Sequence, residues 1–213
     1  MGQKVHPKGL RLGITKMWDS RWLFSDKKMY RDSLIEDIKV RDGVMKKFGF
    51  AHVTQVEIER AINRITVIIH AVKPGMIIGR GGKGLEDVKK FILGVVGEMR
   101  ADKDKIKTEF KIEPVKKPYL NAYYVASEVA SKLVRNLPHR RVVHLSMNKV
   151  MESGAKGVKI QLAGRIAGTI IGRTEKYFEG SVPASTIRED IDFARVPALT
   201  RSGYVGVKVW IAR

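Results

Sequence analysis

Cysteine is absent from this 213-residue sequence, which excludes disulfides, thiolate catalysis and zinc fingers with cysteine ligands, and which fits a reducing compartment. Long apolar runs are absent as well, since no stretch of about eighteen apolar residues is available to span a membrane. The first residues lack the apolar core of a signal peptide, and His6 stands where a myristoylation signal has Ser or Thr. We therefore expect an intracellular protein with no membrane partner.

Acidic residues are scarce relative to basic ones. The 22 Asp and Glu stand against 41 Lys and Arg, which leaves a formal net charge of +19. Such an excess repels itself unless a polyanion neutralises it, and nucleic acid is the obvious polyanion. Hydrophobic residues make up 44% of the chain, enough for ordinary cores. The composition thus predicts a folded nucleic-acid-binding protein with one large or two small domains.

Catalytic and metal-binding patterns are also lacking. No G-x-S-x-G elbow or paired-carboxylate motif stands out, and the histidines have no metal-ligand spacing with nearby carboxylates. The histidines are His6, His52, His70, His139 and His144. We expect no enzymatic activity, no metal and no cofactor.

The first half of the chain predicts a basic arm followed by a small α+β unit. Residues 1–16 are basic and are interrupted by glycine and proline, which is typical of an arm that a partner orders. Apolar residues recur at roughly helical spacing from Asp26 to Phe48, with a break near Gly43, so two short helices are expected there. The patterns beyond predict, in order, a hairpin, a helix and a half-buried strand: 53–60 with 64–72, 85–99, and 105–115.

A charged stretch with two prolines, residues 113–119, is typical of a linker, and the pattern restarts beyond it. Apolar residues at helical spacing predict two helices, over 122–137 and 143–151, that end at Pro138 and Gly154. Alternating residues then predict strands, separated by Gly, Pro and Ser clusters at intervals that suit antiparallel hairpins. These strands are 157–164, 168–180, 186–194 and 204–212.

The predicted fold class is α+β, with two domains after the arm. Residues 17–116 are expected to form helices on a three-stranded sheet. Residues 117–213 are expected to form two helices on a four-stranded antiparallel sheet.

The stretch GMIIGRGGKG, residues 75–84, is the main candidate for a binding site. Gly79, Gly81 and Gly84 match the dinucleotide-binding pattern, but KPGMII separates them from the preceding strand and the next strand alternates with charge. A phosphate-binding P-loop is excluded because Lys83 is followed by Gly84 instead of Ser or Thr. A purely structural turn leaves the two basic residues of the stretch unexplained.

The stretch fits better as the GXXG loop of a type II KH domain, which it resembles in both the loop and the order of elements. Glycines remove the side chains that would hold a sugar-phosphate backbone away, the amides at the next helix start favour an anion, and basic residues add charge. The repeated IIGR at 170–173 is not a second such loop, because Thr174 and Glu175 replace the glycine pair and the surroundings alternate like a strand. The candidate RNA-binding residues are Gly79, Arg80, Gly81, Gly82 and Lys83.

Longer motifs recur in order from Gly2 to Ile211. They are GQKVHPKGLRLGI at the start, GAKGVKIQLAGRIAG at 154–168, RTEKYFEGSVP at 173–183, STIREDIDF at 185–193 and GVKVWI at 206–211. Together they resemble the bacterial ribosomal protein S3 family, the third protein of the small ribosomal subunit. The resemblance implies a protein in the head of that subunit, which binds rRNA, lines the channel where mRNA enters and contacts the tenth and fourteenth small-subunit proteins. It also implies a ribosome in the cytoplasm or, alternatively, in an organelle.

In that family a pair of arginines and a basic residue three places on face the incoming mRNA and act on its secondary structure. Arg140 and Arg141 match the pair, while His144 stands at the third place and lowers the charge there near neutral pH. The apolar stripe of the predicted helix leaves Arg141 and His144 on the opposite side. Charges in the arm or beside glycines are further candidates for rRNA contacts: Lys4, Lys8, Arg11, Lys156, Lys159 and Arg165.

Two other functions stay open from the sequence. A free KH protein could regulate or chaperone RNA, and a nucleotide-dependent enzyme could use the glycine turn. A free regulator would need only the KH unit, so the basic arm and the second half of the chain favour the ribosomal function.

Overall fold

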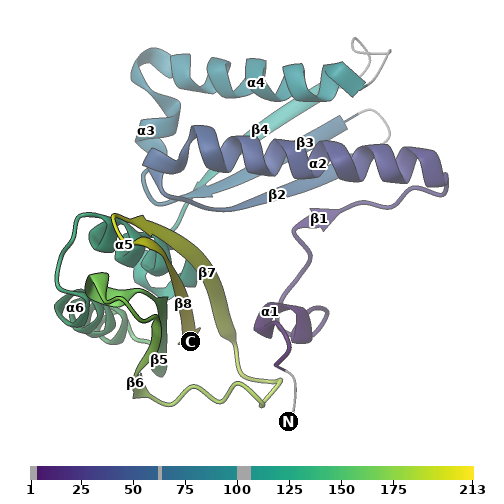
Figure 1. The fold of residues 1–213 in the computed structure, drawn as a ribbon. Coiled ribbons are helices and arrows are strands. Elements are labelled where there is room, and N and C mark those ends of the chain that lie inside the picture. Colours follow the sequence, from purple (N-terminus) through teal and green to yellow (C-terminus); the bar gives the residue numbers. More distant parts are fainter. Residues whose placement is uncertain (1–3, 62–63, 100–106) are drawn as a thin grey trace. The chain divides into compact units, whose positions relative to one another are not determined.

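The structure, a computed structural model, describes residues 4–61, 64–99 and 107–213. The chain divides into two compact units, Trp18–Lys116 and Met1–Met17 with Lys117–Arg213, and each unit buries an apolar core of its own. Both units pack helices on a sheet, so the predicted α+β class is confirmed (Figure 1). Across the described ranges, no helix combines the length and the apolar character needed to cross a membrane.

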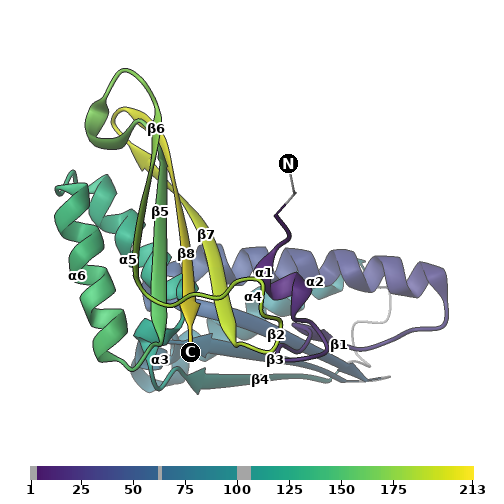
Figure 2. The ribbon, with the colours of Figure 1, turned by 90° about the horizontal axis from the view of Figure 1, so that it is seen from below.

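Helices cover one face of a mixed sheet in the unit Trp18–Lys116 (Figures 1 and 2). The strand order is β1-β2-β3-β4, with β2 and β3 antiparallel and the outer strands parallel to their neighbours. The predicted order of elements is confirmed, and a two-residue strand, β1, adds to the three predicted strands. The first two residues of the strand predicted over 105–115 lie outside the described residues. The elements are β1 (Ser20–Arg21), α2 (Lys27–Lys47), β2 (Val53–Ala61), β3 (Arg64–Ala71), α3 (Pro74–Ile78), α4 (Lys83–Met99) and β4 (Lys107–Pro114).

Residues 27–47 form one helix, α2, and not the two short helices predicted from the sequence. Gly43 faces α4, where a Cβ on it would lie 2.3 Å from Cζ of Phe91. The glycine therefore does not break α2 but lets the two helices pack closely. Farther along the core side, Val40 and Val44 are buried against the sheet.

The N-terminal half of α2 buries acidic side chains, which hydrophobic periodicity did not predict. The cause is Arg60 of β2, whose Nη1 lies 2.7 Å from Oε2 of Glu36 and whose Nε lies 2.8 Å from Oδ1 of Asp37. Asp37 also accepts a hydrogen bond from Nε1 of Trp22 at 2.7 Å. Because buried charges require partners, the acidic side of the helix turns inward. The apolar residues of the same half are left partly exposed: Met29, Leu34, Ile35 and Ile38.

Two helices cover one face of an antiparallel sheet in the other unit (Figure 2). Helix α5 packs on β7 and β8, and α6 packs on β5 and β6, with alanine, valine, leucine and isoleucine side chains between them. The strand order is β6-β5-β8-β7. The elements are α5 (Ala122–Val134), α6 (His139–Glu152), β5 (Gly157–Gly164), β6 (Arg173–Gly180), β7 (Ile191–Thr200) and β8 (Gly203–Ala212).

The connection between β6 and β7 is not a hairpin, because these strands lie at opposite edges of the sheet. Two predicted strand starts were therefore wrong. Strand β6 begins at Arg173, so the second IIGR is mostly loop, and Ile170 and Ile171 are 90% and 81% exposed. Strand β7 begins only at Ile191, since residues 181–190 have to cross to the far edge.

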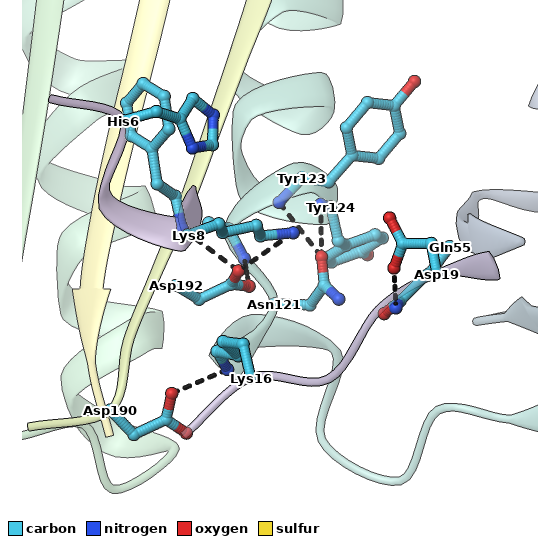
Figure 3. Close-up of polar contacts among 12 residues, drawn as sticks. His6, Lys8, Lys16, Asp19, Gln55, Asn121, Tyr123, Tyr124, Asp190 and Asp192 are labelled. Atoms are coloured by element: carbon cyan, nitrogen blue, oxygen red, sulfur yellow. Dashed lines mark hydrogen bonds and ion pairs between the residues drawn. The ribbon is translucent and has the colours of Figure 1, made fainter. Parts of the chain in front are cut away.

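The segment 4–17 is fixed against the C-terminal part of the chain and is not a free arm (Figure 3). It contains the short helix α1 (Pro7–Leu10). Nζ of Lys8 lies 3.3 Å from Oδ1 of Asp192, and Nζ of Lys16 lies 2.6 Å from Oδ1 of Asp190. The expected RNA contact by Arg11 is corrected, because this side chain is fully buried. Its guanidinium donates, over 2.7–3.1 Å, to the main-chain oxygens of Pro7, Ala184, Thr186 and Glu189.

Candidate nucleic-acid interface

The predicted GXXG loop lies between the short helix α3 and the N-terminus of α4. Gly79, Gly81 and Gly82 have φ angles of 68°, 65° and 78°, in the left-handed region that favours glycine. A Cβ on Gly81 or on Gly82 would meet no heavy atom within 4 Å. The surface beside the loop is therefore open, and a sugar-phosphate backbone can approach the main chain there.

Gly84 lets the loop turn tightly into α4. A Cβ at this position would lie 2.0 Å from the main-chain oxygen of Ile77, so α4 can start this close to α3 only with glycine. Ile77 is itself fully buried and anchors α3 in the core. The loop between the two helices is thus held at both ends.

The loop carries the groups that an anion requires. Lys83, the first residue of α4, is exposed, and Arg80 belongs to the turn between the glycines. The main-chain amides at the start of a 17-residue helix carry a partial positive charge that favours phosphate. The structure brings all five predicted KH residues together in one turn, which has Glu86 as its acidic neighbour in the first turn of α4.

Arg140, Arg141 and His144 are all exposed on α6. The helix begins at His139, four residues before the apolar stripe predicted over 143–151, and its buried side packs against the sheet. That side is formed by Val142, Val143, Ser146, Met147 and Val150. The structure therefore gives α6 a basic N-terminal surface that is separate from its packed side.

A polar cluster links the first turn of α6 to strand β6. Nε2 of His139 lies 3.1 Å from Oε2 of Glu175, which also accepts a hydrogen bond from the Tyr177 hydroxyl at 2.5 Å. This bond, together with Arg173 and His139, lowers the pKa of Glu175 although burial opposes the shift. The ring of His144 packs edge-on against Tyr177 at 5.7 Å. Strand β6 therefore contacts the N-terminal part of α6 through His139 and His144.

The further predicted rRNA contacts do not form one cluster. Lys4 is exposed near the described start of the chain. The other cations have internal contacts: Lys8 pairs with Asp192, Nζ of Lys156 lies 2.9 Å from Glu189, Nζ of Lys159 lies 5.3 Å from the centre of the Trp210 ring, and Nε of Arg165 donates to the oxygen of Thr169 at 2.9 Å.

A cavity of about 410 Å³ in the C-terminal unit brings Arg165 together with Arg201 and His139. Arg201, in the turn between β7 and β8, was missed from the sequence. The sequence feature that could have indicated Arg201 is a single arginine in the turn Thr-Arg-Ser-Gly, residues 200–203, between two predicted strands. In the part of the chain that the structure describes, no group of three His, Asp or Glu could hold a metal ion.

Comparison with known proteins gives matches over both units. A family model described as "KH domain" matches residues 39–120, and one described as "Ribosomal protein S3, C-terminal domain" matches residues 129–211. The protein named small ribosomal subunit protein uS3 of Carboxydothermus hydrogenoformans is 42% identical over 211 residues, which cover 99% of this chain and 91% of that protein. The proteins of the same name from Clostridium botulinum strain Loch Maree and Clostridium novyi are each 44% identical over 99% of this chain, and over 91% and 92% of their own lengths.

These relatives carry the name of a ribosomal protein and not of an enzyme. The KH match contains the whole of the loop at residues 79–83, whose geometry fits a nucleic-acid backbone. Because the similarity covers nearly the full length and both matches occur in the expected order, the chain belongs to the ribosomal protein S3 family and contains a KH domain.

Proposed function

We propose that this protein is a structural constituent of the small ribosomal subunit in a bacterial cytoplasm and that its KH loop binds rRNA. The observation that carries RNA binding is the GXXG loop, where three glycines have left-handed φ angles and the space beside Gly81 and Gly82 is open. Similarity over the whole chain favours a ribosomal protein over a free KH regulator, which would need only the KH unit.

The KH loop can be tested with the double variant Arg80→Asp/Gly81→Asp in the fragment 17–116. The two carboxylates repel phosphate, the space beside Gly81 is open, and aspartate tolerates the left-handed φ angle of this position better than most residues, so the fold should persist while single-stranded RNA binding weakens at least about tenfold. Lys46→Asp/Gly49→Asp is the matched control, because it makes the same change in charge at two exposed positions of the same unit. Equal affinities of the two variants in a filter-binding titration would reject the loop as the binding site.

We further propose that the N-terminal surface of α6 contacts mRNA as it enters the ribosome and helps to unfold it. Three exposed side chains support this proposal: Arg140 and Arg141 supply permanent charge, and His144 supplies charge only when protonated. Since the packed side of α6 is separate, the surface can vary without loss of the core. The resemblance to the family adds rRNA of the head and the tenth and fourteenth small-subunit proteins as partners, and the exposed apolar residues of α2 offer a surface for a protein neighbour.

The mRNA contact predicts opposite effects of two substitutions. Arg140→Ala/Arg141→Ala should slow translation through a stable hairpin and leave subunit assembly and unstructured messages nearly unchanged. His144→Lys should speed passage, because it adds a permanent charge whose effect at an exposed site is about 0.2–1 kcal/mol. Arg135→Ala/Arg188→Ala removes two exposed arginines elsewhere in the unit and is the control. Equal hairpin passage for all four proteins in a reconstituted translation assay would contradict the proposal.

A further inference from the structure

One face of the C-terminal sheet carries aromatic and basic side chains in register. The strand pairing brings one residue from each strand into a row across the sheet: Phe178, Lys159, Trp210 and Phe193. The neighbouring row on the same face is Lys176, Gln161, Lys208 and Arg195. Directly paired residues point to the same side of a sheet, so these eight side chains form one surface, which we call the aromatic–basic face.

The aromatic–basic face is the side of the sheet that α5 and α6 do not cover. In β5 the intervening residues Val158, Ile160 and Leu162 are fully buried in the core with the helices. Because successive side chains of a strand alternate, Lys159 and Gln161 lie on the other side. The connection 181–190 approaches this side next to Gly157, where a Cβ would lie 2.4 Å from the oxygen of Ser181, and α1 packs on β7.

Neighbouring side chains of the aromatic row contact one another. The rings of Trp210 and Phe193 are 5.0 Å apart at 42°, and Nζ of Lys159 lies 5.3 Å from the centre of the Trp210 ring. His6 packs edge-on against Phe193 at 5.0 Å and supports that end of the row. At the other end Phe178, on the edge strand β6, is 71% exposed. The Phe178 ring therefore offers an open face beside the cations of the neighbouring row.

The second row supplies positive charge that no carboxylate neutralises. Neither row contains Asp or Glu, and across the described residues Lys176, Lys208 and Arg195 have no ion pair. The carboxylates nearest in the chain to Arg195 are already paired: Glu189 with Lys156, Asp190 with Lys16 and Arg213, and Asp192 with Lys8 and Arg213. Glu175 and Glu179 lie next to Lys176 and Phe178 in β6 but alternate to the other face of the sheet. The third row on this face is small and flat, with Thr174, Ala163, Gly206 and Pro197.

We propose that the aromatic–basic face binds single-stranded RNA, with bases stacked on Phe178 and Trp210 and phosphates held by the cations of the second row. Unpaired cations beside the aromatic rings favour a polyanion over an acid-poor protein surface, and stacking on a sheet requires unpaired bases. The small side chains of the third row leave room for the RNA strand to cross the sheet. This site is distinct from the KH loop and from the N-terminal surface of α6, so it is a further RNA contact of the chain.

The test uses the full chain with the KH loop blocked by Arg80→Asp/Gly81→Asp and measures binding of a fluorescein-labelled single-stranded octanucleotide by anisotropy. In this background Phe178→Leu keeps an apolar side chain and removes the ring, so affinity should fall at least about fivefold, whereas Phe178→Trp should retain it. Lys176→Gln/Lys208→Gln should also weaken binding and flatten its salt dependence. Phe50→Leu, at another exposed phenylalanine, is the matched control and should change nothing.

Thermal unfolding should be the same for all Phe178 variants, because this ring lies outside the core. If Phe178→Leu binds RNA as well as Phe178→Trp, bases do not stack there and the proposal is wrong. That result would point to a protein on this face, since leucine preserves an apolar contact. Both results are independent of the KH loop, because the loop is blocked in every sample.

Discussion

Arg60 is a buried charged residue of the KH domain, and it pairs with two buried carboxylates, Glu36 and Asp37. Its side chain is 2% exposed, and Glu36 and Asp37 are fully buried. Taking these charges out of water is unfavourable, and the ion pairs with short hydrogen bonds offset that loss only while all three are present. The Trp22 indole completes the shell of Asp37.

Arg60→Leu should lower the free energy of unfolding of the KH domain by about 3–5 kcal/mol, because it removes the guanidinium that pairs with two buried carboxylates. Hydrogen exchange of β2 and α2 measures this loss. The control is Arg21→Leu, since Arg21 is exposed and pairs with Glu57 at 3.1 Å and Glu59 at 3.3 Å on the same sheet. Its loss should be below about 1 kcal/mol. Equal protection in the two variants would contradict a buried network.

Two glycines of α4 should respond to alanine in opposite directions. Gly84→Ala places a Cβ 2.0 Å from the main-chain oxygen of Ile77, which cannot move independently. We therefore expect the free energy of unfolding to fall by about 1–3 kcal/mol. A Cβ on Gly94 would meet no atom within 4 Å, so Gly94→Ala should stabilise α4 by about 0.5–1 kcal/mol through helix propensity. The melting temperature of the full chain measures both effects. A change of the same sign for the two variants would disprove the close approach of α3 and α4.

The segment 4–17 acts as a clamp that holds the connection 181–190 and the start of β7. Asp192 is the centre of this clamp and accepts hydrogen bonds from the amide of Ala122 at 2.8 Å and from Arg213 at 3.3 Å (Figure 3 shows its contact with Lys8). Burial by itself raises the pKa of Asp192, but Lys8, the Ala122 amide and Arg213 outweigh burial and lower it.

The lowered pKa of Asp192 predicts a loss of stability in acid. The unfolded carboxyl titrates near pH 4. The stabilisation is therefore complete above that pH and disappears as the pH falls through the lower pKa of the folded state. Asp192→Asn should lower the free energy of unfolding by about 1–3 kcal/mol at pH 7. The variant should also lose less of this free energy than the wild type when the pH falls from 5 to 2. Hydrogen exchange of residues 191–200 measures this change in stability with pH. Asp190→Asn, at a half-buried site, is the control.

Elements with a single apolar stripe could be predicted from sequence, and those shaped by distant residues could not. Helix α6 follows the periodicity because Val143, Met147 and Val150 pack on its own sheet. In α2 the same rule fails because Arg60, from a later strand, draws the acidic side inward. The start of β7 was missed because alternation cannot show that the chain must first cross the sheet.

The net charge of +19 is the dominant electrostatic property of the protein. Part of this charge is used internally, since Arg11 and Arg60 are buried and Lys8 and Lys16 pair with aspartates. The exposed remainder should bind RNA through release of counterions.

Binding of the free protein to single-stranded RNA should therefore depend strongly on salt and only modestly on sequence. With about five phosphates neutralised, the slope of log affinity against log salt is about −3.5, and affinity falls roughly a hundredfold between 50 and 200 mM salt. A peptide nucleic acid of the same bases has no phosphates and should not bind. A slope near zero in anisotropy titrations would show that the charge is not used on RNA.

The α+β class, the KH domain and the family could be predicted from the sequence, because glycine spacing, charge and ordered motifs are local properties of the chain. Which basic residues are available to a partner depends instead on how the chain folds. Arg11 and Arg141 look alike in the sequence, yet one has its donors satisfied by four main-chain oxygens and the other is exposed on α6. The aromatic–basic face also appeared only with the strand order, because the register between β6, β5, β8 and β7 joins residues that are far apart in the chain. Burial, ion pairing and cross-strand contact depend on distances in space, which periodicity along the chain does not encode.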